Sequence, residues 1–83
     1  MNVDLRRMRH VVEIARVGGI SPAARSLNIT QPALTRSLAE VEAALGMALF
    51  NRTPRGVSVT DAGQVFVTGA RKMLRDYDDL MGG

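Results

Sequence analysis

The segment Ser21–Leu45, SPAARSLNITQPALTRSLAEVEAAL, predicts two short helices joined by a tight turn. We expect Ser21 to cap the first helix, because its hydroxyl can accept a hydrogen bond from a free first-turn N–H, and Pro22 suits the position after such a cap. Asn28 tolerates the left-handed conformation that a tight turn needs, and Thr30 is the expected cap of the second helix. Two helices joined in this way form a helix-turn-helix.

The second helix of the motif separates an apolar side from a side of mostly small residues. Helical spacing places four apolar residues in one stripe: Leu34, Leu38, Val41 and Leu45. The opposite side carries a single cation among small residues: Pro32, Arg36, Ala39 and Ala43. The DNA major groove admits an α-helix, and an arginine can donate two hydrogen bonds to guanine there. A surface helix of a helical bundle, with Arg36 in water, fits the same pattern, so the periodicity alone leaves both interpretations open.

The composition indicates one small, helix-rich domain that binds a polyanion. The chain has 83 residues, no cysteine and a net charge of +3. Basic residues, nearly all arginine, outnumber acidic ones up to Val59, whereas the charges almost balance from Thr60 onward. Arginine suits bidentate contacts with phosphate and guanine, although an ordinary basic domain could carry the same charge. No apolar run is long enough to span a membrane, so we expect a cytoplasmic protein without membrane partners.

The segment before the motif predicts a helix from Met1 to Val17. Its apolar stripe contains Leu5, Met8, Val12 and Ala15, and the Gly18-Gly19 pair is expected to end it. His10 is the only histidine, and no second candidate ligand lies near it in the sequence. We therefore expect a surface or partly buried side chain at this position instead of a metal ligand or a catalytic group.

Residues 47–60 predict a small β-hairpin after Gly46, the expected end of the second motif helix. Two short extended runs, Ala48–Arg52 and Gly56–Thr60, flank a turn that contains Pro54 and Arg55. Beside a helix-turn-helix, an exposed Arg55 at the tip of such a wing could enter the DNA minor groove, with Arg52 on its flank. A loop with two solvated arginines is the alternative.

The remaining residues predict one long amphipathic helix capped by Thr60 and Asp61. Apolar residues recur in it at alternating intervals of four and three, as in a coiled-coil seam: Phe66, Ala70, Met73, Tyr77 and Leu80. A second copy of the helix would bury this seam, and folding back onto its own domain is the other solution. We expect neither a catalytic residue nor a metal site, because one histidine and no cysteine offer little to build one from.

Three runs of this sequence, in this order, resemble the N-terminal DNA-binding domain of LysR-type transcriptional regulators. They are AARSLNITQPALTR (residues 23–36), LGMALFNR (45–52) and RGVSVTDAG (55–63). The resemblance implies a mainly α fold: a winged helix-turn-helix of three helices and a small β-hairpin in residues 1–60, then a linker helix in residues 61–83 that pairs two subunits. A larger inducer-binding domain is expected in the full-length protein and is absent from this chain.

The resemblance also implies sequence-specific binding of double-stranded DNA by a homodimer that regulates transcription at a dyad-symmetric operator. The residues in the matching positions for DNA contact are Thr30, Gln31, Pro32, Ala33, Thr35, Arg36, Arg52 and Arg55, with Arg55 in the minor groove. No cofactor is expected in this chain, and a small-molecule inducer is expected for the absent domain. A full-length tetramer and a contact with RNA polymerase are compatible with the resemblance, but no residue in the sequence points to either. An acidic protein partner and non-specific architectural DNA binding remain alternatives.

Overall fold

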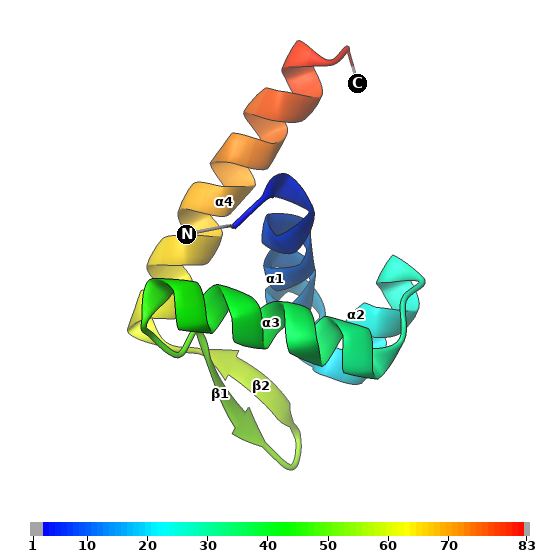
Figure 1. Cartoon of the computed structure of the whole chain (residues 1–83), viewed down its shortest axis with the longest axis vertical. Helices are drawn as coiled ribbons and strands as arrows, with labels where there is room; N and C mark the ends of the chain where they lie inside the picture. The colour runs from blue at the N-terminus through cyan, green and yellow to red at the C-terminus, as the bar shows by residue number, and fades with distance from the viewer. Residues whose placement is uncertain (1–2, 83) are drawn as a thin grey trace.

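Four helices and one hairpin make up the described part of the chain, residues 3–82 of a computed structural model (Figure 1). In chain order they are α1 (Leu5–Val17), α2 (Ile20–Leu27), α3 (Gln31–Leu45), β1 (Phe50–Thr53), β2 (Gly56–Val59) and α4 (Asp61–Leu80). The mainly α architecture, with three helices, a wing and a long last helix, confirms the predicted fold class.

The start of α1 differs from the prediction. The Asp4 carboxylate accepts a hydrogen bond from the Arg7 N–H at 2.8 Å and caps the helix, which therefore begins at Leu5 and not at Met1. Of the four residues removed from the predicted helix, Met1 and Asn2 lie outside the described residues. The predicted end is confirmed, because Gly18 adopts the left-handed conformation that terminates α1.

The two helices of the motif are present, but Ser21 does not cap the first. Gly19 is the N-cap of α2, with an extended backbone and no side-chain hydrogen bond, so Ser21 lies inside the first turn. The prediction failed because Gly18 and Gly19 alone connect the two helices, so α2 begins earlier than Ser21. Asn28 does adopt the left-handed conformation, with φ of 58°. The Thr30 hydroxyl accepts from the Ala33 N–H at 3.2 Å, which confirms this cap.

The core fixes which side of α3 faces outward. Leu34, Leu38 and Val41 are fully buried against Val11 and Ile14 of α1 and their neighbours in one cluster, while Leu45 is partly buried beside it. Burying each such side chain contributes about 1.5–3 kcal/mol. The apolar stripe is thus confirmed as core, and the side that carries Arg36 is left exposed.

The hairpin is attached to the helical body close to its tip. Its strands pair antiparallel, from Phe50 opposite Val59 to Thr53 opposite Gly56, so Pro54 and Arg55 form the tip. The Val57 N–H donates to the Gly18 carbonyl at 3.1 Å, which attaches β2 to the turn between α1 and α2. Figure 1 shows the wing projecting from the helical body on the side away from the C-terminal end of α4.

Helix α4 packs along the domain, and its C-terminal end projects beyond it (Figure 1). The Thr60 hydroxyl accepts from the Gly63 N–H at 2.9 Å, which confirms the predicted cap. The buried residues of the helix are Gly63, Val67, Ala70 and Leu74. Further along, Asp78 accepts from Arg9 of α1 at 2.7 Å. One face of α4 is therefore covered within the chain.

Candidate nucleic-acid interface

A groove lies between the wing and the N-terminal ends of α2 and α3. Residues far apart in the sequence meet there: Ser21 of α2, Gln31 of α3, and Arg52 and Arg55 of the wing. None of the described residues that line the groove is acidic. Three of the predicted DNA-binding residues are thus brought together in an environment that attracts a polyanion.

The outward face of α3 begins at this groove. Thr30, Gln31, Pro32 and Ala33 are exposed, and Thr35 is partly exposed. These side chains are small or uncharged, so a partner can approach the backbone of the first turn closely. The first turn is also the positive end of the helix dipole, where unpaired N–H groups favour phosphate.

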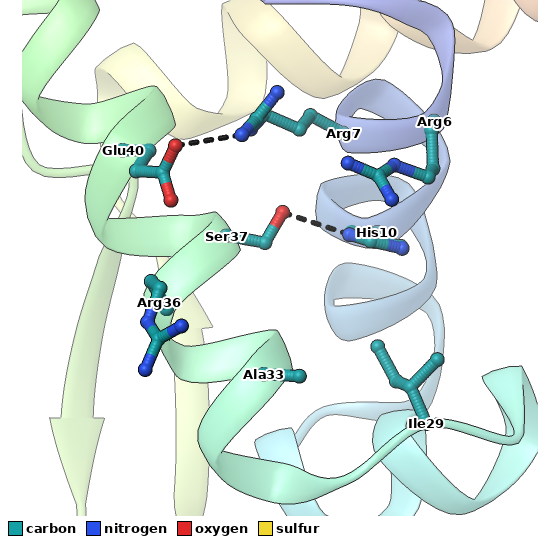
Figure 2. A pocket seen from close by; sticks show the side chains of 8 residues that line it. All are labelled: Arg6, Arg7, His10, Ile29, Ala33, Arg36, Ser37 and Glu40. Atoms are coloured by element: carbon teal, nitrogen blue, oxygen red, sulfur yellow. Dashed lines mark hydrogen bonds and ion pairs between the residues drawn. The ribbon is translucent and has the colours of Figure 1, made fainter.

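Arg36 is the cation of this face. Figure 2 shows its side chain pointing away from His10, whereas Ser37, the next residue, points toward His10. Within residues 3–82 neither a side-chain hydrogen bond nor an ion pair engages the guanidinium of Arg36, Arg52 or Arg55. All three side chains are exposed, so their donors are free to meet phosphates or bases.

Several other arginines have structural partners. Arg7 binds Glu40 of α3 at 2.6 Å, and Arg9 binds Asp78 of α4. These two ion pairs connect α1 to α3 and to α4. Part of the positive charge of the chain is therefore used to hold the helices together.

His10 is partly buried and holds α1 against α3. Its Nδ1 atom lies 2.7 Å from the Ser37 hydroxyl, and Figure 2 shows this contact across the cleft between the two helices. Burial lowers the pKa of His10, and the nearby charge of Arg6 lowers it further, so the neutral ring is favoured. This agrees with the expectation of a partly buried histidine.

Glu13 connects α1 to α2. Hydrogen bonds from Arg16, the larger effect, and from Ser26 lower the pKa of this carboxyl to about 2. The carboxylate thus remains ionised in mildly acidic solution, and its contacts support the position of α2.

An apolar strip remains exposed on α4. The exposed fractions are 76% for Val65, 53% for Met73, 40% for Tyr77 and 82% for Leu80. Val65, Phe66, Ala70 and Met73 also line an apolar groove with Met8 of α1. Of the five predicted seam residues, Ala70 is only 4% exposed and is buried within its own chain, whereas Met73, Tyr77 and Leu80 are exposed. Phe66 is half-buried and packs against the core.

The sequence did not indicate a contact between the two motif helices at the groove. The Ser21 hydroxyl donates to Oε1 of Gln31 at 2.8 Å. The residues are ten positions apart, and Ser21 had been interpreted as a cap, so no local pattern pointed to this contact. The motif turn brings the two N-terminal ends together.

The described residues can also be compared with the requirements of a metal site and of a membrane-spanning helix. No group of three or more histidine, cysteine, aspartate or glutamate side chains within residues 3–82 is arranged to hold a metal ion. In the same residues, none of the helices has the length and apolar character required to cross a membrane.

Residues 5–64 match the model of the family described as bacterial regulatory helix-turn-helix protein, lysR family. The chain belongs to the LysR family. This is a family of DNA-binding transcriptional regulators, which are not enzymes. Similar proteins include the regulator TfdT of Cupriavidus pinatubonensis, 42% identical over 72 residues that cover 87% of this chain and 32% of TfdT. The nitrogen assimilation regulatory protein nac of Escherichia coli is 42% identical over 76 residues, 92% of this chain and 25% of nac. The LysR-family chain thus spans about a quarter to a third of the length of these relatives.

Solved structures of LysR-family domains on DNA have the same fold. The CbnR DBD–DNA complex superposes with a TM-score of 0.89 at 32% identity, covering 93% of this chain and 88% of that one. The BenM DBD in complex with catB site 1 DNA gives 0.92 at 33% identity, with 95% and 88% covered. The arrangement of the motif, the wing and α4 is therefore that of domains that have been crystallised with DNA.

Proposed function

We propose that this chain binds a specific sequence of double-stranded DNA as a dimer and so directs transcriptional regulation. The observation that carries the proposal is the groove in which Gln31 of α3 meets Arg52 and Arg55 of the wing without an acidic neighbour. Phosphates of a duplex would be attracted to this side of the domain, and α3 would enter the major groove.

In this proposal, side chains on the exposed face of α3 contact the base edges. Arg36 has free donors that suit guanine O6 and N7, and the amide of Gln31 lies at the exposed N-terminal end of the same helix. Pro32, Ala33 and Thr35 would allow close approach of the helix to the base edges. Thr30, at the cap, would contact the DNA backbone.

The wing contributes the second contact. Arg55 is exposed at the hairpin tip, where it could reach an adjacent minor groove, and Arg52 on the strand before it would meet the backbone. Because Val57, two residues after Arg55, donates a hydrogen bond to the Gly18 carbonyl, the tip keeps a defined position relative to α3.

Dimerisation is assigned to α4. Its exposed Met73, Tyr77 and Leu80 form an apolar strip, and Phe66 lies at the edge of the groove with Met8. A second α4 would remove these side chains from water, and the pair would place two α3 helices on two half-sites of a dyad-symmetric operator. A larger domain of the full-length protein would bind a small-molecule inducer, and the regulator would act in the cytoplasm on the nucleoid.

Selection of bound duplexes from a random pool at near-physiological salt tests the proposal. We expect enrichment of an interrupted inverted repeat by the wild-type domain and its loss with Arg36→Ala. Lys72→Ala serves as the control, because Lys72 pairs with Asp76 on α4 and lies outside the groove. A pool that stays random, with binding that vanishes as salt rises, would indicate architectural binding. No binding to DNA would direct attention to an acidic protein partner.

A further inference from the structure

We infer that Ser21 is a positioning residue that fixes the amide of Gln31, so that α3 presents hydrogen-bond donors to DNA and selects guanine over adenine at the base that Gln31 contacts. The inference rests on the proposed function, because it requires α3 in the major groove. It assigns a role in specificity to a residue that does not itself read a base.

Within the described residues, the Ser21 hydroxyl has one hydrogen-bond acceptor, Gln31. Gly19 occupies the cap position, so the hydroxyl is not needed there. Ser21 is the second residue of α2, and no carbonyl of its own helix lies four residues before it, where a helical serine usually donates. The hydroxyl instead donates to Oε1 of Gln31 at 2.8 Å. The contact holds the carbonyl end of the amide against α2.

The opposite end of the amide is consequently free. A glutamine amide has one carbonyl oxygen and one NH2 group with two donors. Within residues 3–82 the structure shows no partner for Nε2 of Gln31, and the side chain is exposed. DNA that approaches the groove would bring hydrogen-bond acceptors to this donor end.

The orientation of the amide decides which base it can read. Adenine is recognised by glutamine through both ends of the amide, with the oxygen accepting from N6 and the nitrogen donating to N7. Guanine presents two acceptors, O6 and N7, which suit the NH2 group alone. The bond from Ser21 occupies one of the two lone pairs of Oε1 and holds this end of the amide toward α2. The glutamine therefore presents its NH2 end and favours guanine, and a released glutamine gains the adenine pairing.

The test measures affinities of the domain for four duplexes that differ only at the base pair under Gln31, identified by selection with wild-type and Gln31→Ala proteins. For the wild type we expect guanine to be bound about tenfold more tightly than adenine, the lower range for a bidentate contact. Ser21→Ala should reduce this ratio to about one while preferences at the other positions remain. Ser21→Thr keeps the hydroxyl and should retain the guanine preference. Thr68→Ala removes an exposed hydroxyl of α4, outside the groove, and should change nothing at this base.

A double-mutant comparison excludes a general structural effect. In a Gln31→Ala background, Ser21→Ala should no longer alter the ratio, because the amide that it positions is gone. An adenine preference in the wild type, or a ratio unaffected by Ser21→Ala, would overturn the inference while leaving sequence-specific binding in place. A wild-type protein that enriches no sequence at all would instead refute the proposed function itself.

Discussion

The replacement of Gly63 by alanine tests how closely α4 approaches the segment that leads into the wing. A Cβ atom at Gly63 would lie 1.9 Å from the Leu49 carbonyl oxygen, and real Cβ atoms stay beyond 3.0 Å, so the two segments would have to separate by about 1.1 Å. Both are backbone, and no flexible side chain can yield. The same Leu49 oxygen accepts the Thr60 N–H at 3.0 Å, and this hydrogen bond would be strained by the separation.

The expected magnitude follows from three contributions. Overpacking at a site that cannot relax costs about 1–3 kcal/mol. Loss of the Thr60 hydrogen bond adds about 1 kcal/mol. The better helix propensity of alanine offsets about 1 kcal/mol. We therefore expect Gly63→Ala to lower the free energy of unfolding by about 1–3 kcal/mol, with a corresponding fall in Tm of about 4–8 °C per kcal/mol.

Gly69→Ala is the matched control, because it makes the same substitution in the same helix. No atom lies within 4 Å of a Cβ built at Gly69. Within one subunit only the propensity gain remains, so at a concentration where the domain is monomeric this variant should be more stable than the wild type by about 0.5–1 kcal/mol. Urea unfolding followed by circular dichroism, at one protein concentration, compares the two. Equal changes of the same sign would show that Gly63 is not in the close contact described.

Three further predictions concern binding, assembly and pH. Arg36→Ala should weaken binding to the selected operator by about 1–3 kcal/mol in fluorescence anisotropy and flatten base preference, whereas an equal loss on random DNA would reveal a phosphate contact only. Met73→Asp should shift the domain from dimer to monomer in sedimentation velocity without unfolding it, and a variant that stays dimeric would remove the exposed strip of α4 from the interface. The pKa of Glu13 is lowered to about 2, so its stabilising contribution is present above its ordinary value of 4.5 and is lost as pH falls from 4.5 toward 2. Unfolding at a series of pH values should therefore show a shallower acid loss in Glu13→Gln than in the wild type, and identical slopes would contradict the assignment.

Features with a local cause could be predicted from the sequence. Asn28, Gly46, Thr30 and Thr60 end or begin their elements through the conformation of one residue or a hydrogen bond within one turn. The hairpin and the apolar stripe of α3 follow in the same way from short-range patterns. The prediction that Ser21 caps α2 was wrong because Gly19 occupies the N-cap position. A side chain that suits a cap does not determine at which residue the helix begins.

The site depends on contacts that no local pattern encodes. Gln31 and Arg55 meet only because the hairpin is attached to the turn before α2, so the sequence could nominate both residues but could not place them together without the family resemblance. The heptad pattern of α4 shows a similar limit. It identified Ala70 as apolar, yet the pattern cannot tell whether its own domain or a partner buries it, and the structure buries it against its own domain.

The hydrogen bond from Val57 of the wing to Gly18, in the turn between α1 and α2, has a consequence for protein engineering. Gly56 has φ of +130°, and a Cβ there would lie 2.4 Å from the Gly18 carbonyl oxygen that binds Val57. The wing can therefore keep this contact with the turn only when glycine occupies position 56. A chimaera that borrows a wing to change minor-groove preference must keep this glycine. Any other residue there would push the hairpin away from the turn between α1 and α2.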